Sequence, residues 1–300
     1  MTQVARAGWP TDPQSMMAAP PAAAPAGWDA ALALSYVRRG PRTVMVKNEH
    51  TGPLVVQKTL YPEGEAVCHT VILHPPGGIA GGDRLAVEVE AGAGAEVLLT
   101  TPGATKWYKA DSRPAAQRTH LRAARNAIVE WLPQEAIVFD GADAHASLQV
   151  DLDEGARAAG WDTVVFGRGA AGERFTHGRF RQSIEIRRSG VLLWAEYGDV
   201  RGGGELLSSP AGYAGRAVSG MLWVCGGGID DAAMAACRER AAALPQRMLA
   251  GVTCLPGDLL LARCLCDADD EARRFLAEVW NLLRPLYANR VATAPRLWAT

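Results

Sequence analysis

The sequence has few cysteines, no excess of charge of either sign and no long apolar segment. Its 31 lysine and arginine residues face 32 aspartate and glutamate residues, a formal net charge of −1. This balance argues against a protein built to bind nucleic acid or an anionic membrane surface, because both partners require a basic excess. The best apolar run, residues 217–229, has 13 residues with four glycines and is too short to cross a bilayer.

Six cysteines in 300 residues are too few for a disulfide scaffold. The N-terminus places Arg6, Asp12 and several prolines where a signal peptide would have a continuous apolar core. We therefore expect reduced thiols and a cytoplasmic location. With 48% hydrophobic and 21% charged residues, the composition is that of a globular chain with a sizeable core.

Alanine and proline make up 13 of the first 26 residues. A stretch so often interrupted by proline can neither hold a helix nor bury a core. We therefore expect residues 1–26 to form a flexible tail and residues 27–300 to form a single β-rich domain.

Short β-branched runs separated by Gly, Pro and Asp dominate from Trp28 to about Cys225. Several alternate strictly between apolar and polar residues, which predicts antiparallel strands with one buried face and one wet face. No helical period interrupts them, which argues against a parallel α/β fold because parallel strands need crossover helices. Periodicity alone therefore favours a β-sandwich. We expect strands over 43–46, 54–57, 67–73, 85–90, 96–101, 148–152, 183–186, 191–194 and 259–266.

The helical signal is confined to the C-terminal quarter of the chain. An Ala-rich stretch over residues 230–244 begins with acidic and continues with basic side chains, as the helix dipole favours. A second stretch over residues 269–287 spaces its apolar side chains by three and four residues, which predicts one buried stripe.

The densest motif is the Gly-rich segment 73–84. A phosphate-binding P-loop requires Lys-Ser/Thr after its last glycine, whereas Asp83 and Arg84 follow Gly82; a dinucleotide fingerprint requires glycine where Ile79 stands. The segment is better explained as a tight connection between strands, with backbone requirements met by Gly77, Gly78, Gly81 and Gly82.

Other chemical motifs are weak. The sequence has neither a His-Glu-x-x-His zinc helix nor a Gly-x-Ser-x-Gly nucleophile elbow. Glu135 and Asp140 could be a carboxylate pair for acid–base chemistry, but such pairs are common in a chain with 32 acids.

Possible metal ligands are scattered rather than clustered. Cys68 and His69 are adjacent, and His74 follows five residues later. Cys264 and Cys266 share one face of the expected strand 259–266, where we expect buried thiols acting as small hydrophobic groups. His69 and His74 could be satisfied core residues or could reach a surface or channel, and both alternatives stay open.

Six segments stand in a characteristic order: Gly52–Lys58, Tyr61–Gly64, His74–Asp83, Thr100–Tyr108, Leu132–Phe139 and Gly167–Glu173. In this order they resemble the urease accessory protein D family, also called UreD/UreH. The resemblance runs from about Gly27 to the C-terminal helix. It implies a mainly β fold, a solenoid-like (β-helical) stack of strands with a small C-terminal helical addition.

The resemblance implies a maturation chaperone rather than an enzyme. Such a protein binds the urease apoprotein and recruits accessory proteins F and G, of which G binds and hydrolyses GTP. The assembly then inserts nickel into the urease active site. No cofactor would be held tightly by this chain. Nickel in transit would need weak oxygen ligands, as in a water-filled tunnel, because a tight His/Cys site would trap it.

The family motifs also indicate roles for individual residues. The implied candidates for nickel passage are His74, Asp83, Glu135 and Asp140. The implied structural or partner contacts are Thr105, Lys106, Tyr108 and Arg168, together with the four glycines of segment 73–84. No tight metal site is expected, with Cys68 and His69 as weak candidates. The alternatives are a docking scaffold that never contacts nickel, and a β-fold hydrolase that uses Glu135 and Asp140.

Overall fold

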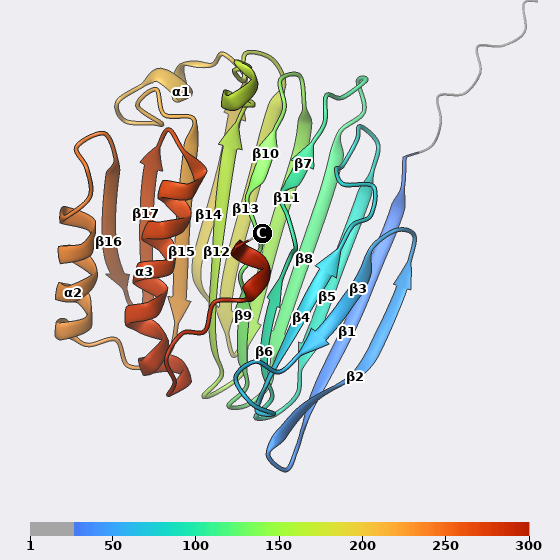
Figure 1. Cartoon of the computed structure of the whole chain (residues 1–300), viewed down its shortest axis with the longest axis vertical. Coiled ribbons are helices and arrows are strands. Elements are labelled where there is room, and N and C mark those ends of the chain that lie inside the picture. The colour runs from blue at the N-terminus through green and yellow to red at the C-terminus, as the bar shows by residue number, and fades with distance from the viewer. Residues whose placement is uncertain (1–26, 300) are drawn as a thin grey trace, which may run out of the picture.

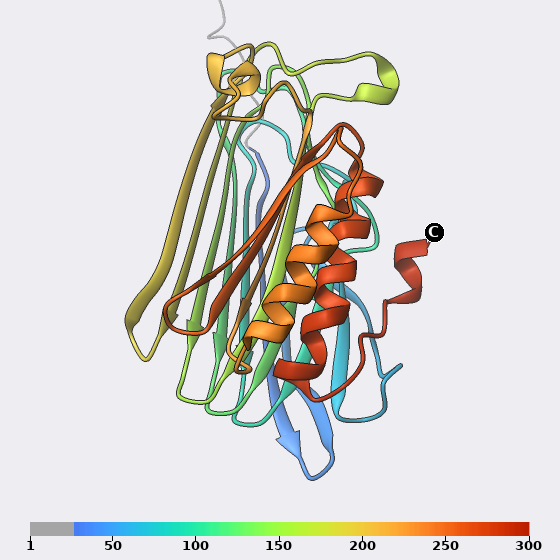
Figure 2. The ribbon, with the colours of Figure 1, turned by 90° about the vertical axis from the view of Figure 1, so that its left-hand side faces the viewer.

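Two β-sheets packed face to face form the body of the protein, and two helices cover the outer face of the larger sheet (Figures 1 and 2). This computed structural model describes residues 27–299, so the tail expected over residues 1–26 lies outside the described part of the chain. The helices are α2 (Asp231–Ala242) and α3 (Asp269–Ala288), where the sequence predicted them. None of the helices within residues 27–299 combines the length and the apolar character that a membrane span requires.

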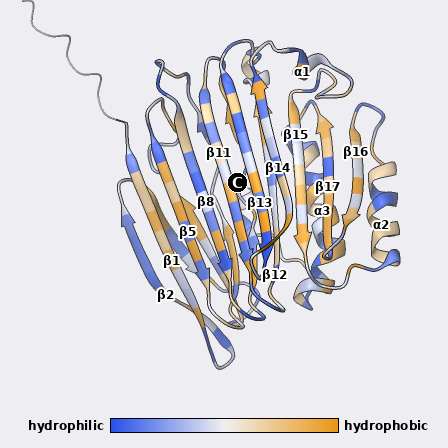
Figure 3. Ribbon diagram, turned by 180° about the vertical axis from the view of Figure 1, so that it is seen from behind, coloured by the Kyte–Doolittle hydropathy of each residue, from blue (hydrophilic) through white to orange (hydrophobic). Residues whose placement is uncertain are grey.

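The smaller sheet has seven strands. In spatial order they are β14 (Val191–Arg201), β13 (Arg179–Arg188), β11 (Asp143–Leu152), β8 (Ala115–Ala123), β5 (Arg84–Ala91), β1 (Asp29–Arg39) and β2 (Arg42–Thr51). One face packs on the other sheet; Figure 3 views this sheet from the opposite side, and its strands mix hydrophilic and hydrophobic residues along their length.

The larger sheet has ten strands. Its main path is β16 (Leu249–Leu255), β17 (Leu259–Cys266), β15 (Val218–Cys225), β12 (Arg157–Phe166), β9 (Ile128–Trp131), β6 (Glu96–Thr100), β4 (Val67–Leu73) and β3 (Val55–Leu60). Off this path, β10 (Ala136–Val138) pairs with β12 and with β7 (Thr105–Trp107). The remaining elements are the short α1 (Glu205–Ser208), η2 (Gly169–Ala171) and η3 (Arg296–Ala299).

The central strands form a solenoid. From β4 to β13 the chain passes back and forth between the sheets, so each coil adds one long strand to each sheet, and two coils also add the short β7 or β10 to the ten-stranded sheet. Successive strands of one sheet therefore run parallel, as in β5–β8–β11–β13 and in β4–β6–β9–β12. This confirms the β-rich, solenoid-like fold class.

The expectation of antiparallel pairing was wrong for these central strands. It assumed that a parallel pair needs a crossover helix. Here the crossover is the strand contributed to the opposite sheet, which returns the chain to its starting edge without any helix. Antiparallel pairs occur toward the ends of the stack, for example between β1 and β2 and between β15 and β17.

The protein has two apolar layers. One lies between the sheets and includes Leu34, Val89 and Leu121. The second lies between the ten-stranded sheet and the helices, and there Phe275 and Trp280 of α3 are fully buried, as the stripe predicted. In this second layer the thiols of Cys264 and Cys266, at the end of β17, are also buried, which confirms their interpretation as core thiols.

Candidate functional site: a polar channel between the sheets

The parallel register of the solenoid stacks the inward side chains of successive coils into rows across the interior. One of these rows is entirely apolar and consists of Val89, Leu121, Val150 and Ile186. Four residues earlier on each strand, the inward row consists of Leu85, Gln117, Ala146 and Gln182. Amide side chains therefore enter the space between the sheets at this second row.

Three neighbouring cavities lie in the polar part of the interior. A central cavity of about 80 Å³ is bordered by Thr119, Asp162 and Gln182. It shares Gln117 with a cavity of about 450 Å³ beneath the Gly-rich segment. On the other side it shares Asp162 and Gln182 with a cavity of about 390 Å³ near β14 and β17. Together these three adjoining cavities, which share lining residues, are called the channel here; its lining mixes polar and apolar side chains.

Asp162 is the carboxylate at the centre of this channel. It lies on β12 on the same face as Val164 and Phe166, which pack between the sheets. Its Oδ2 accepts a hydrogen bond from Gln182 Nε2. Burial raises the pKa of Asp162 to about 7. The carboxyl group is therefore partly protonated near neutral pH.

His74 borders the channel at the opposite side from β14. It lines the cavity of about 450 Å³ together with Gly77 and Gly78. Its Nε2 is buried and has no hydrogen-bond partner among residues 27–299. Burial lowers the pKa of His74, and the nearby Asp83 charge opposes that shift. A neutral imidazole is thus available at this cavity.

Asp83 is buried and holds the Gly-rich segment in place. Its Oδ1 accepts a hydrogen bond from Trp28 N, and its Oδ2 accepts one from Ala80 N, both at 2.8 Å. Gly78 leaves no room for a side chain, because a Cβ there would lie 2.3 Å from the ring of Tyr108. Gly82 has φ +94°, which only glycine adopts without strain.

The other two glycines of the segment have separate requirements. A Cβ on Gly81 would lie 2.9 Å from the carbonyl oxygen of Arg113, whereas Gly77 has open space around it but takes φ +75°.

Glu135 lies away from the channel, beside α3. Its Oε2 is 3.9 Å from a guanidinium nitrogen of Arg273, and the neighbouring Gln134 Oε1 accepts a hydrogen bond of 3.1 Å from the same Arg273. Glu135 is half-buried. The structure does not bring it together with Asp162.

Asp140 organises a loop at the end of the stack. Its Oδ1 accepts hydrogen bonds from Thr176 N at 2.6 Å and His177 N at 2.7 Å. Burial would raise the pKa of Asp140, but these hydrogen bonds outweigh it and hold the pKa at about 2. The carboxylate of Asp140 is thus occupied by backbone N–H groups.

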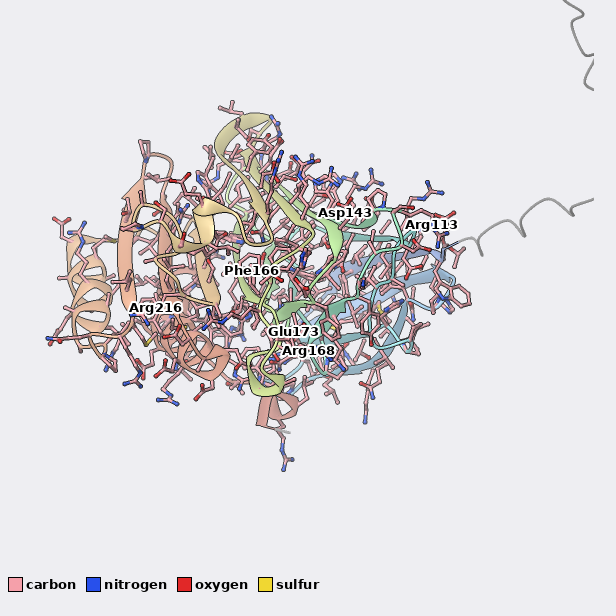
Figure 4. All side chains as sticks on the ribbon, turned by 90° about the horizontal axis from the view of Figure 1, so that it is seen from above. Arg113, Asp143, Phe166, Arg168, Glu173 and Arg216 are labelled. Atoms are coloured by element: carbon pink, nitrogen blue, oxygen red, sulfur yellow. The ribbon has the colours of Figure 1, made fainter. Side chains whose placement is uncertain are left out.

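Arg168 is joined to Asp140 through Glu173. The guanidinium of Arg168 forms a two-nitrogen contact with the Glu173 carboxylate, 2.6 Å at its shorter distance, and Glu173 also accepts a hydrogen bond from Asp140 N. Arg168 lies 4.4 Å above the ring of Phe139, and Tyr108 meets that ring edge-on. Figure 4, which views the molecule from the top of Figure 1, shows Arg168 and Glu173 close together among the loops that follow the strands.

Two of the family-motif residues on β7 lie closer to the channel. Thr105 borders both the central cavity and the cavity of about 450 Å³, and Lys106 borders the latter. The residues assigned to nickel passage and to partner contacts therefore belong to one end of the stack, but only some of them reach the channel.

Cys68 and His69 point to opposite faces of β4. Cys68 packs between the sheets, whereas His69 Nε2 lies 2.6 Å from Glu63 Oε1 on the helix side. The adjacent pair therefore cannot share one ion. In the described part of the chain, no three His, Cys, Asp or Glu side chains converge into a metal-binding cluster.

The sequence reasoning missed a buried ionic cluster between the ten-stranded sheet and α3, which we call the Arg284 cluster. The guanidinium of Arg284 contacts Glu130 Oε2 at 2.8 Å and Glu63 Oε2 at 2.6 Å. Burial lowers the pKa of Arg284, but the two carboxylates outweigh it and raise that pKa. Trp280 Nε1 and Tyr287 OH also donate hydrogen bonds to Glu130. A signal existed, because Arg284 stands within the apolar stripe of α3.

Asp162, Gln117 and Gln182 were missed as well. Each is a polar residue at a strand position whose alternation assigns it to the buried face. That signal could single out each position, but the register that brings the three together is not readable from local pattern.

Sequence comparisons with known proteins identify the family of this chain. The family model described as UreD urease accessory protein matches residues 29–299. A protein of Azoarcus sp. (strain BH72) named urease accessory protein UreD is 47% identical over 93% of this chain and 96% of its own length. Proteins with the same name from Dechloromonas aromatica and Pseudomonas aeruginosa PAO1 are each 47% identical over 91% of this chain and 95% of their own lengths. The chain therefore belongs to the UreD family of urease accessory proteins.

Proposed function

We propose that this chain is a urease-maturation chaperone that holds accessory proteins F and G on the urease apoprotein and carries nickel through the channel between its sheets. Membership of the family supports a role in urease maturation. The finer proposal depends on one observation: a carboxylate, Asp162, stands in a polar channel inside an otherwise apolar stack.

The ligands of the channel suit a cation in transit. Its polar side chains are mainly hydroxyls and amides, with Asp162 as the charged group of the central cavity. Nickel bound by such oxygen atoms would be held weakly and would leave readily, whereas imidazole and thiolate ligands would retain it. GTP would be bound by protein G and not by this chain.

The loop end of the stack is the surface that we propose for partner contacts. There the segments around Tyr108, Phe139 and Arg168 are held against one another by aromatic and cation–π contacts. Such a rigid surface presents aromatic and arginine side chains of the kind enriched in protein interfaces. On this proposal His74 lies at one mouth of the path with Asp83 beside it, whereas Glu135 and Asp140 would act on the ion outside the channel.

The test replaces Asp162 by Asn in cells that carry a urease gene cluster lacking this gene. Asp162→Asn should restore assembly of the complex but lower both the nickel content and the activity of urease, because the amide cannot neutralise the ion. Asp199→Asn is the matched control, since Asp199 pairs with Arg179 on the outer face of the seven-stranded sheet.

Each outcome selects one function. Full nickel loading with Asp162→Asn would refute passage of nickel through the channel and would favour a docking scaffold. Full urease activity at limiting nickel in cells without any copy of the gene would refute the proposed role in urease maturation. Glu135→Ala and Asp140→Ala test in the same assay whether these two residues are needed for nickel delivery.

A further inference from the structure

The channel ends near β14 and β17 in a chamber that contains opposite charges. This cavity of about 390 Å³ is lined by Asp162, Glu196, Tyr213, Arg263 and other residues. Glu196 belongs to the seven-stranded sheet and Arg263 to the ten-stranded sheet, and their side chains form an ion pair across the gap between the sheets. Both side chains are partly exposed, at 36% and 50%, so the pair stands at the mouth of the chamber.

Tyr213 lines the same chamber as the two carboxylates. Its phenol is buried, and burial raises the pKa of Tyr213 to about 12, with further contributions from the negative charges of Glu196 and Asp162. Both carboxylates are therefore within electrostatic reach of one hydroxyl group. The chamber thus combines two carboxylates, a neutral phenol and one guanidinium.

Without the guanidinium, this set would suit a divalent cation. Carboxylate and hydroxyl oxygens are ligands for hard and borderline metal ions, and two negative charges in a partly buried chamber attract a doubly charged ion strongly. Arg263 opposes the binding of a divalent cation in two ways. It pairs with the Glu196 carboxylate, and it places a positive charge in the chamber.

We propose that Arg263 is an internal counter-ion that keeps the acidic chamber from retaining metal, so that nickel passes Asp162 and Glu196 without being trapped. This inference rests on the proposed nickel path and assigns a role to a residue that need not contact the ion. Its consequence is unusual for a metal-handling protein: removing a positive residue should strengthen metal binding and weaken delivery.

The experiment measures binding of Ni²⁺ to the purified full-length chain by equilibrium dialysis, alongside the nickel content of urease matured with each variant. Arg263→Met should bind Ni²⁺ about tenfold more tightly than wild type and deliver less of it to urease. Arg263→Lys keeps the charge and should stay close to wild type. The double variant Arg263→Met/Glu196→Gln should return to weak binding.

Arg179→Met is the matched control, because it breaks an ion pair with Asp199 on the outer face of the seven-stranded sheet, away from the chamber. It should leave the affinity for Ni²⁺ unchanged. A purely structural role for Arg263 predicts a lower melting temperature with unchanged or weaker Ni²⁺ binding, and that result would overturn the proposal. Thermal unfolding of each variant separates the two.

The binding measurement is independent of urease. Unchanged nickel delivery by Asp162→Asn would refute the proposed nickel path. Unchanged Ni²⁺ affinity of Arg263→Met would refute only the proposed role of Arg263. If Arg263→Met fails to fold, Arg263→Gln replaces it and carries the same expectation of tighter binding.

Discussion

The ten-stranded sheet carries charged side chains on both of its faces, and the two faces differ in how completely those charges are buried and paired. On the helix side, Glu130 receives hydrogen bonds from Arg284, Trp280 and Tyr287 in a cluster with almost no exposed surface. On the side of the other sheet, Asp162 borders cavities and, among residues 27–299, accepts a hydrogen bond from Gln182 alone.

The difference separates a structural use of buried charge from a functional one. A buried ion pair with every partner in place fixes one arrangement of the groups around it. A partly buried carboxylate with few partners has a raised pKa and keeps its proton to higher pH. Its oxygen atoms are not occupied by other cationic groups. The predictions below test this contrast, beginning with the largest expected effect.

Removing the cation of the Arg284 cluster should have the largest effect on stability. Arg284→Met leaves the carboxyl groups of Glu130 and Glu63 buried without their cation, which should cost about 3–5 kcal/mol of unfolding free energy. Urea denaturation measures it. Arg274→Met, which breaks the exposed pair with Asp270 on the same helix, should cost less than about 1 kcal/mol. Equal stabilities of the two variants would contradict the structural role of the cluster.

The pH dependence of stability should show the burial of Asp162. Its pKa is about 7 in the folded chain, whereas an unperturbed aspartate has a pKa of 3.8. Between these values the folded chain holds a proton that the unfolded chain has released, so stability falls as pH rises from about 4 to 7. Asp162→Asn should remove this loss of at most about 4 kcal/mol. Parallel pH profiles of variant and wild type in urea denaturation would show that Asp162 is not perturbed by burial.

Glu63 should produce a smaller dependence of the opposite sign. Burial would raise the pKa of Glu63, but hydrogen bonds from His69 and Arg284 outweigh it and lower the pKa from 4.5 to about 2. The stabilisation is therefore present above about pH 4.5 and is lost as pH falls toward 2. Glu63→Gln should flatten this acid limb of the denaturation profile. An unchanged acid limb would mean that another carboxylate controls it.

The smallest effect is expected at the exposed loop end. Asp140→Ala removes the acceptor for two backbone N–H groups and should cost about 1 kcal/mol, because those groups can reach water instead. The change should be local. Limited proteolysis should cleave segment 168–178 faster than in wild type, with a nearly unchanged melting temperature. A large drop in melting temperature would show that this loop supports the whole stack.

Nine of the seventeen strands within residues 27–299 and both long helices were predicted from the sequence, because their signals are local. The alternation over residues 85–90 and 148–152 and the apolar stripe of residues 269–287 all correspond to observed elements. The pairing direction was not predictable, since strand alternation is the same in parallel and antiparallel sheets. Only the family resemblance indicated the solenoid.

The candidate site was less accessible to sequence reasoning. His74 was singled out beside its Gly-rich turn and does line a cavity. Asp162 and Arg263 were not, because each is an ordinary charged residue within a strand until the partner strand across the interior is known. Glu130 and Arg284, 154 positions apart, meet only through the packing of α3 on the sheet.

The sequence by itself determined which segments become strands and helices and that the chain is a UreD-type accessory protein, because periodicity and ordered motifs are properties of neighbouring residues. Only the tertiary structure decided which inward polar residues share a channel and which charged residues pair across the core. The reason is physical: a buried charge is stabilised or left reactive by the groups that surround it in space, and the register of the coils brings those groups from distant parts of the chain.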